Sequence, residues 1–265
     1  MMFSIIIRNK NESEALQRML PILIGQYSYY FNEIILIDNN STDDSVKVAK
    51  YYNCRIEYIC QFSYGRSINL GMSYAINNYV LLLSAHAMPI GQSFFKTALK
   101  KIDEHDNVAG LRFINSFENF EYAFKNNFIT KEEPIKNGLM NACSVINKNI
   151  WELYKFDENL PACEDKEWSM RVIENNFKII QVPETFFYFP KRGNKGILRR
   201  HRIEKTAEMV IKREKPMSYL KILGVSIYSI TIKNIIRFFK NITNEIRLLG
   251  TRLAIRRDST KYYRS

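Results

Sequence analysis

The chain has 265 residues, of which 46% are hydrophobic and 25% charged, and its formal net charge is +12. This length and apolar content allow a full hydrophobic core, so the composition excludes an intrinsically disordered chain. Four cysteines without a CxxC pair exclude a disulfide-rich scaffold. Since the first residues also lack the long apolar segment of a signal peptide, we expect a cytoplasmic protein.

The positive charge is concentrated towards the C-terminus. Residues 191–265 hold 20 Lys and Arg against 5 Asp and Glu, whereas residues 1–190 hold 19 against 22. A basic tail on a slightly acidic body indicates a separate electrostatic role, either at nucleic acid or at an anionic membrane surface. No uninterrupted apolar run reaches the roughly 18 to 20 residues needed to cross a bilayer, so no membrane-spanning helix is expected.

Strands and helices alternate through the first part of the chain. Apolar runs bounded by polar turns predict strands at residues 3–7, 33–37, 54–59 and 79–84. Helical spacing of apolar residues predicts helices at residues 15–23, 44–52 and 65–78. This alternation predicts an α/β fold with a parallel sheet wound in the Rossmann manner.

The pattern becomes less regular after Pro89. We expect a helix near residues 94–104, a strand near 108–113 and an aromatic, Asn-rich loop over 115–136. Loops of that length inside a compact domain usually carry function or are mobile. The segment "EDKEWSMRVIENN" predicts a helix, and "FKIIQVPETFFYF" predicts a last pair of strands interrupted at Pro183.

The basic C-terminal segment has a helical pattern of its own. Apolar residues recur at helical spacing from Ile232 to Leu253, and basic residues such as Lys233, Arg237 and Lys240 fall largely on the other side. The pattern predicts an amphipathic helix. Two interpretations remain: the apolar stripe packs against the body of the protein, or it lies in a membrane interface.

Polar clusters follow the predicted strands, at the edge where open α/β sheets bind ligands. Asp38 ends the second strand, where a carboxylate either accepts a hydrogen bond from a nucleobase or ribose or shapes a turn. Arg66 and Asn69 lie three residues apart at the start of a helix, so they share a face that suits phosphate. Ser84 and His86 follow the fourth strand, where the histidine either caps a turn or contacts a ligand.

An acidic pair, Glu164 and Asp165, opens the helix "EDKEWSMRV". Carboxylates in a first helical turn commonly interact with the helix dipole. The functional alternative is a general base that removes a proton from an acceptor hydroxyl. Arg171, further along this helix, is expected to be a structural ion-pair partner.

Taken in order, "SIIIRNKNE", "ILIDNNSTDDS" and "EDKEWSMR" resemble motifs of the inverting family 2 glycosyltransferases of the GT-A fold. More narrowly, "FSYGRSINLG", "LSAHAMPI" and "LPACEDKEW" look like a bacterial subgroup labelled as rhamnosyltransferases. The resemblance implies a Rossmann-like mixed sheet flanked by helices. It spans residues 3 to about 205, so we expect a GT-A domain over residues 1–205 and a basic amphipathic helical extension over 206–265.

The resemblance also implies roles for individual residues on the donor side. Asp38 would hold the uracil or thymine of a UDP- or dTDP-sugar, and Arg8, Glu12 and Asn40 would line the nucleoside pocket. Arg66 and Asn69 would face the diphosphate.

The acceptor side follows from the acidic pair. Asp165, beside Glu164, would be the base that activates the acceptor hydroxyl in an inverting displacement.

The leaving diphosphate needs a counter-charge. Relatives carry Asp-x-Asp and a divalent cation, Mn²⁺ or Mg²⁺, where this chain reads Ser84-Ala85-His86. His86 either ligates such an ion, hydrogen-bonds the diphosphate directly or is structural. Arg199 and Arg200, in "LRRHRIEK", are alternative cations for the same charge.

Three other functions compete with sugar transfer. A sugar-nucleotide pyrophosphorylase would share the layout, but the first strand is not followed by a Gly-rich phosphate loop. A non-catalytic relative that binds sugar nucleotides or glycans is compatible with the missing Asp-x-Asp, although the acidic pair is intact. Nucleic-acid binding through the tail is disfavoured, because apolar residues interleaved with charges suit a lipid surface better.

These inferences combine into one expected setting for the protein. We expect an enzyme at the cytoplasmic face of the inner membrane, held peripherally by its tail. It would glycosylate a glycan or a lipid-linked acceptor for a surface polysaccharide such as capsule or O-antigen.

Overall fold

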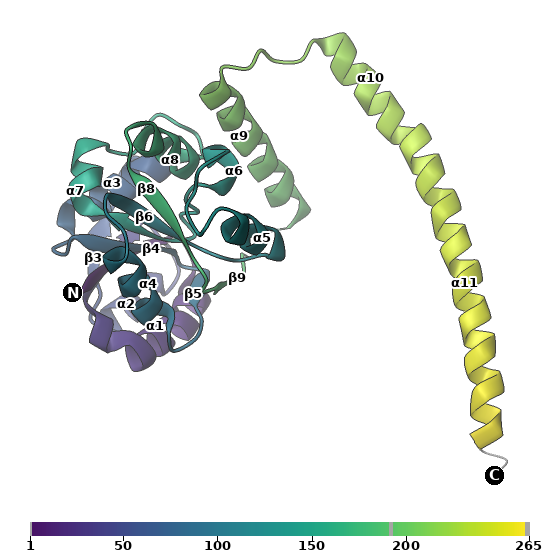
Figure 1. The fold of residues 1–265 in the computed structure, drawn as a ribbon, viewed down its shortest axis with the longest axis horizontal. Helices are drawn as coiled ribbons and strands as arrows, with labels where there is room; N and C mark the ends of the chain where they lie inside the picture. The colour runs from purple at the N-terminus through teal and green to yellow at the C-terminus, as the bar shows by residue number, and fades with distance from the viewer. Residues whose placement is uncertain (1, 191–192, 263–265) are drawn as a thin grey trace. The chain divides into compact units, whose positions relative to one another are not determined.

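The computed structural model describes residues 2–190 and 193–262, which form two compact units, Met1–Arg213 and Glu214–Ser265. The first unit holds both sheets and the helices up to α9 (Asn194–Lys212), and the second holds α10 (Tyr219–Ile230) and α11 (Ile232–Tyr262) (Figure 1). Helix α9 runs across residues 205 and 206, where the sequence predicts the domain boundary, and lies wholly within the first unit.

The first unit is built on a seven-stranded sheet with the order β3-β2-β1-β4-β7-β6-β8. Its strands are β1 (Phe3–Asn9), β2 (Phe31–Asp38), β3 (Arg55–Tyr58), β4 (Tyr79–Ser84), β6 (Val108–Phe113), β7 (Cys143–Asn147) and β8 (Lys178–Val182). A second sheet pairs β5 (Ala87–Pro89) with β9 (Phe186–Tyr188) in antiparallel fashion. The strands expected from the apolar runs are therefore present.

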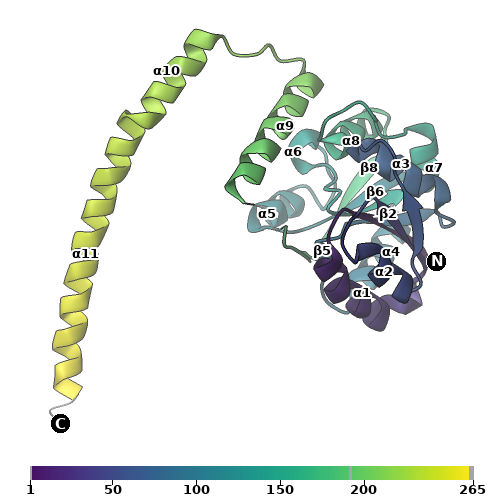
Figure 2. The same ribbon diagram turned by 180° about the vertical axis from the view of Figure 1, so that it is seen from behind.

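Helices cover both faces of the large sheet, as the two ribbon views show (Figures 1 and 2). One face packs against α1 (Ser13–Tyr27), α2 (Ser45–Tyr51) and α4 (Phe94–Asp103). The other face packs against α3 (Tyr64–Tyr74), α7 (Lys148–Leu153) and α8 (Glu164–Glu174). The remaining short helices are η1 (Ser28–Tyr30), α5 (Phe117–Lys125) and α6 (Pro134–Asn137).

The uniformly apolar sequence of β1 is explained by burial on both faces of the sheet. Successive side chains of a strand point to opposite faces. Ile5 and Ile7 accordingly enter the core with α1, while Ile6 enters the core with α3. All three isoleucines are 0% exposed, which is the pattern of a central strand in a two-sided sheet.

The large sheet is mixed, as the motif resemblance implies, and its first four strands are parallel, as the alternating pattern predicts. β7 is antiparallel to both β4 and β6, whereas β1, β2, β3 and β4 are mutually parallel. The register brings Cys143, the first residue of β7, opposite Leu83 near the end of β4. The connection from β6 thus begins and ends at the carboxyl edge without crossing the sheet. The next strand, β7, therefore runs antiparallel to β6.

The second unit is helical and exposes many apolar side chains. The stretch Tyr219–Ser259, interrupted at Thr231, has a mean hydropathy of 1.4 in its most apolar window, of which 0% is buried. By length and composition this helix could cross a membrane. The expectation that no segment is long enough was wrong, because it counted only uninterrupted apolar runs and ignored that a helix tolerates interspersed polar residues.

Candidate active site

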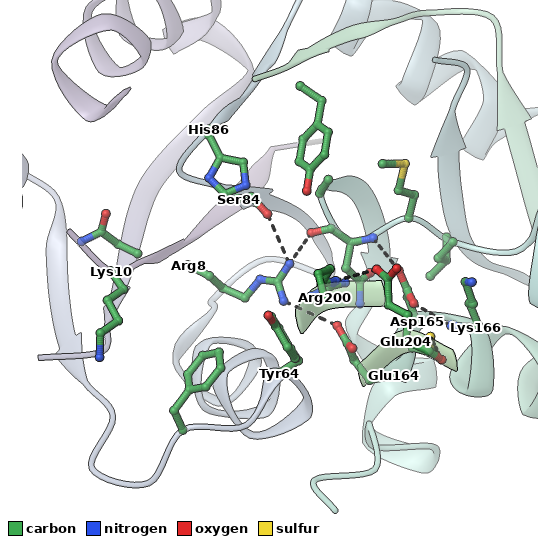
Figure 3. Close-up of a pocket in the computed structure, with 18 of the residues that line it drawn as sticks. Arg8, Lys10, Tyr64, Ser84, His86, Glu164, Asp165, Lys166, Arg200 and Glu204 are labelled. Carbon is green, nitrogen blue, oxygen red and sulfur yellow. Dashed lines mark hydrogen bonds and ion pairs between the residues drawn. The ribbon is translucent and has the colours of Figure 1, made fainter. Parts of the chain in front are cut away.

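A cavity of about 790 Å³ lies at the carboxyl edge of the large sheet. Arg8 at the end of β1 and Ser84 at the end of β4 contribute to its wall, as do Glu164 and Asp165 at the start of α8. Helix α9 adds further side chains, including Arg200. In Figure 3 Lys10 lies at one end of the cavity and Lys166 at the other, with Arg8 between them. The topology thus gathers polar residues from distant parts of the chain at one edge.

Arg8 connects three parts of the site (Figure 3). Its Nη2 donates to the carbonyl oxygen of Asn141 at 2.6 Å and lies 3.5 Å from Ser84 Oγ. Its Nη1 forms an ion pair with Glu164 Oε1 at 3.5 Å. The first strand is thereby linked to β4, to the segment before β7 and to α8.

The two members of the acidic pair occupy different environments. Glu164 is 4% exposed, and burial together with the neighbouring Asp165 charge raises the pKa of its carboxyl to about 7, against the opposing effect of Arg8. Asp165 is only partly buried, and its Oδ2 accepts from the backbone N–H of Asn141 at 3.0 Å. Asp165 is therefore the better placed of the two to meet a ligand, while Glu164 is buried and paired with Arg8.

The start of α8 is held in an unusual backbone conformation. Cys163, the residue before Glu164, has φ 62° and is buried. This left-handed conformation is uncommon for a residue with a side chain. The thiol packs with Ala162 and with Ala207 of α9, and burial raises its pKa to about 11, so it is not a thiolate nucleophile at neutral pH.

Helix α9 covers one side of the site. Lys166 pairs with Glu208 at 2.9 Å, and this contact helps to hold α9 against the start of α8. The Arg200 guanidinium lies 4.9 Å from the centre of the Tyr64 ring and donates from Nε to Glu204 at 2.5 Å. Arg199 is exposed and does not line the cavity. Of the two arginines suggested by the sequence, the structure thus places Arg200 in the site.

His86 lines the cavity beside a carboxylate. Its Nδ1 lies 3.4 Å from Glu12 Oε1, and its ring contacts the ring of Tyr188 at 5.3 Å. Among the described residues, no group of three or more His, Cys, Asp or Glu side chains is placed to hold a metal ion. One imidazole and one carboxylate do fit an ion that takes its other ligands from water and a substrate diphosphate, as Mg²⁺ commonly does.

Only some of the residues predicted to hold the nucleoside line the cavity. Arg8 and Glu12 line the cavity, whereas Asp38 and Asn40 do not. Asp38 is 0% exposed, and its carboxylate accepts from Asn9 Nδ2 at 2.8 Å and from the hydroxyl of Ser41 at 2.6 Å. In this structure its oxygens shape the turn after β2.

Arg66 and Asn69 also lie outside the main cavity. Arg66 pairs with Glu158 at 3.0 Å. Asn69 donates to the carbonyl oxygen of Phe156 at 2.9 Å and accepts from Trp151 Nε1 at 2.9 Å. Both side chains therefore hold the segment before α8 in place.

Several residues that line the cavity were missed by sequence reasoning, and two of them are buried polar residues near Asp165. Arg112 on β6 and Asn141 before β7 both line the cavity and are 7% and 2% exposed. Arg112 Nε and Asn141 Nδ2, like Arg8 Nε, are buried donors without a hydrogen-bond partner in the described structure. The only available signal was a charged residue inside the apolar strand sequence "VAGLRF". Buried donors in native proteins normally have acceptors, which water or an oxygen-containing ligand in the cavity would supply for these atoms.

Similar folds occur in several solved glycosyltransferases. A mannosyltransferase from Pyrobaculum calidifontis, solved with GDP-Man and Mn²⁺, gives a TM-score of 0.62 at 14% identity over 85% of this chain and 69% of that one. Glucosyl-3-phosphoglycerate synthase from Mycobacterium tuberculosis gives 0.62 at 10% identity over 82% and 81%. Residues 1–349 of S. aureus TarS, solved with UDP-GlcNAc, give 0.56 at 20% identity, and this chain spans 61% of that length.

The mixed seven-stranded sheet with its cavity at the carboxyl edge is thus a GT-A fold. Residues 4–159 match the profile of "Glycosyl transferase family 2", and the chain belongs to that family. No curated protein sequence matches this chain.

Proposed function

We propose that the protein is an inverting glycosyltransferase that moves a sugar from a UDP- or dTDP-sugar to a hydroxyl group. The observation that carries the proposal is the position of Asp165. This partly buried carboxylate lies in the cavity and is held by two backbone N–H donors, from Asn141 at 3.0 Å and from Lys166 at 2.9 Å. A carboxylate fixed in this way suits a general base.

The donor would lie along the cavity with its nucleoside towards Lys10, Glu12 and Asn39. Two solved structures with this fold, TarS and the mycobacterial synthase, contain a UDP-sugar, which supports a sugar nucleotide as the ligand class. The resemblance of the motifs to rhamnosyltransferases supports a deoxyhexose as the sugar. The anomeric carbon would then lie near the acidic pair.

Transfer needs one base and one counter-charge. The oxygen of the acceptor hydroxyl bonds to the anomeric carbon, and Asp165 takes the proton that this oxygen loses. The bond from the anomeric carbon to the diphosphate breaks on the opposite face. Glu164 stays buried beside Arg8 and does not touch the acceptor. Two negative charges side by side would oppose each other, and the raised pKa of Glu164 reduces that repulsion near neutral pH.

The departing diphosphate would be stabilised by Arg200, whose guanidinium already lines the cavity. A divalent cation, where bound, would be held by His86 and Glu12 and would neutralise charge on the same diphosphate. Ser84 supplies a hydroxyl at this position in place of a carboxylate, which leaves the protein with fewer negative charges to attract an ion.

The test is the Asp165→Asn variant. We expect sugar transfer to fall by a factor of about 100 to 10,000 while binding of the sugar nucleotide is retained. Donor binding is measured by thermal shift with UDP-, dTDP- and GDP-sugars, with and without Mn²⁺, which also identifies the nucleotide. Glu167→Gln on the same helix, where Glu167 pairs with Arg171, is the matched control. Normal turnover by Asp165→Asn would remove this residue as the base.

The acceptor and location are part of the same proposal. The exposed apolar and basic helices α10 and α11 support binding at an anionic membrane surface, which suits a cytoplasmic enzyme acting on a glycan or lipid-linked acceptor for capsule or O-antigen.

A further inference from the structure

Arg112 is an unusual residue for the interior of a sheet. It lies on β6, is 93% buried and has no carboxylate bonded to it in the described structure. Its Nη1 donates to the carbonyl oxygens of Lys136 and Gly138, at 2.9 and 2.6 Å, while its Nε has no partner. Burial lowers the pKa of Arg112, and the nearby Asp165 opposes this effect. This buried cation close to Asp165 thus has an unused donor at Nε.

Asn141 leaves a second donor unused near the same carboxylate. Its backbone N–H donates to Asp165 and its carbonyl oxygen accepts from Arg8. Its side-chain Oδ1 accepts from Ser144 at 3.0 Å, but its Nδ2 is buried without a partner. A buried donor without an acceptor costs roughly 1 to 3 kcal/mol, so these two atoms, on residues that both line the cavity, are donors available to a bound group.

Further positive charge lines the cavity on this side. Lys136 and Lys166 line it together with Arg112, and Lys166 is held in an ion pair with Glu208 at 2.9 Å. Lys136 pairs with Glu118, and both side chains are more than half exposed, so this pair is weak and readily exchanged. Figure 3 shows Lys166 beside Asp165, at the end of the cavity opposite Lys10. The donor nucleoside is assigned to the Lys10 end, so these cations face the acceptor.

We propose that the acceptor carries an oxyanion, a phosphate or carboxylate group close to the hydroxyl that is glycosylated, and that Arg112 and Asn141 bind it. This inference rests on the proposed function, because it takes the Asp165 end of the cavity as the acceptor end. Arg112 supplies charge and Nε–H, and Asn141 supplies Nδ2–H. A neutral sugar hydroxyl would satisfy the amide but would add no negative charge for the guanidinium beyond that of the nearby Asp165.

The competing explanation is that Arg112 only holds the segment from Lys136 to Gly138 in place. Asn141→Ala separates the two explanations, because it removes Nδ2 but keeps the backbone groups that bind Asp165 and Arg8. Arg112→Met removes the charge and is the stronger test where the variant folds. Arg171→Met, which removes an arginine of α8 outside the cavity, is the control.

The experiment is a calorimetric titration of the full chain, saturated with UDP, with glycerol 3-phosphate, glycerate and glycerol as probes. We expect the two charged probes to bind and glycerol not to bind, with at least tenfold weaker binding of the charged probes to Asn141→Ala and Arg112→Met. A preference between the two charged probes distinguishes phosphate from carboxylate. The Arg171→Met control should bind like the wild type.

Three results would overturn the inference. The first is that neither charged probe binds although UDP does. The second is that glycerol binds as well as the charged probes, and the third is that Asn141→Ala binds the charged probes like the wild type. UDP binding is measured separately in every variant. Failure of UDP and of all sugar nucleotides to bind the wild type would instead contradict the proposed function.

Discussion

Arg8 and Glu164 join the first strand of the sheet to the helix that opens with the acidic pair. Arg8 Nη1 lies 3.5 Å from Glu164 Oε1, and their side chains are 12% and 6% exposed. The ion pair does not compensate fully for burial, because the pKa of Glu164 is still raised to about 7. A buried ion pair is thus not by itself a source of stability here.

The raised pKa predicts how stability depends on pH. The ordinary pKa of 4.5 applies to the unfolded chain, so between about pH 4.5 and 7 the folded state keeps a proton that the unfolded state loses. The contribution of this group to the free energy of unfolding is therefore present at low pH and falls as pH rises through that window. The total fall is up to about 3 kcal/mol, and above the window the contribution no longer changes. Urea unfolding from pH 5 to 8 should show less of this slope in Glu164→Gln. Glu167→Gln is the control, and an unchanged slope in Glu164→Gln would contradict the assignment.

The two neighbouring arginines of α9 give a matched pair of variants. Arg200 lines the cavity and Arg199 is exposed outside it. Arg200→Met should weaken UDP binding by roughly 10- to 100-fold, because a charge-assisted hydrogen bond to the diphosphate is lost. Arg199→Met should bind UDP like the wild type, and uridine should bind all three proteins equally. Equal UDP affinities for the two variants would remove Arg200 from the diphosphate site.

Metal dependence can be separated from protein cations by following nucleotide binding. If His86 and Glu12 share an ion with the diphosphate, Mn²⁺ should strengthen UDP binding to the wild type but not to His86→Ala or Glu12→Gln. Transfer by the wild type should then fall on addition of EDTA. Rates that are unchanged in EDTA would show that His86 is not a metal ligand in the reaction.

The fold could be predicted where it depends on local sequence. The apolar run at Phe3–Ile7 became β1, and the run at residues 33–37 became β2, because central strands buried on both faces need continuous apolar residues. The motif resemblance implied a mixed sheet, but it could not say that β7 is the reversed strand, since that depends on the path of the whole connection from Ile114 to Ala142. No local pattern encodes that path.

The site was predictable in part for the same reason. Ser84, His86 and Asp165 follow strand ends or open a helix at the carboxyl edge, and they do meet in one cavity. Helical spacing placed Arg66 and Asn69 on one face of a helix but could not predict what that face contacts. In the structure it contacts the segment at residues 156–158. Arg112 and Asn141 carry no motif at all.

Asn69 should contribute to stability. Its Oδ1 accepts from Trp151 Nε1 at 2.9 Å and from the N–H of Phe156 at 3.1 Å, and all three residues are buried. Asn69→Ala would leave both donors unsatisfied, so we expect a loss of about 2 to 4 kcal/mol in the free energy of unfolding, measured with urea. Donor affinity of the folded fraction should change less than threefold. A large loss of UDP affinity at unchanged stability would instead place Asn69 at the diphosphate, as the motif resemblance implies.

The C-terminal helices give a prediction about the membrane. The unit Met1–Arg213 is compact by itself, so a chain that ends at Arg213 should fold and bind donor but lose binding to vesicles containing anionic lipid. Replacing Lys233, Arg237 and Lys240 by Gln keeps the apolar residues and removes three charges. Each charge is worth about 1 kcal/mol at an anionic surface, so binding should weaken by roughly 100-fold and should depend less on salt.

The same variants distinguish a helix that lies on the surface from one that crosses the bilayer. A surface-bound protein should be released from vesicles by alkaline carbonate, and its binding should depend on the three basic residues. A spanning helix should resist carbonate and should retain binding when those residues are neutral, because its apolar length would then hold it. Vesicle binding that is unchanged when residues 214–265 are deleted would refute a membrane role for the tail.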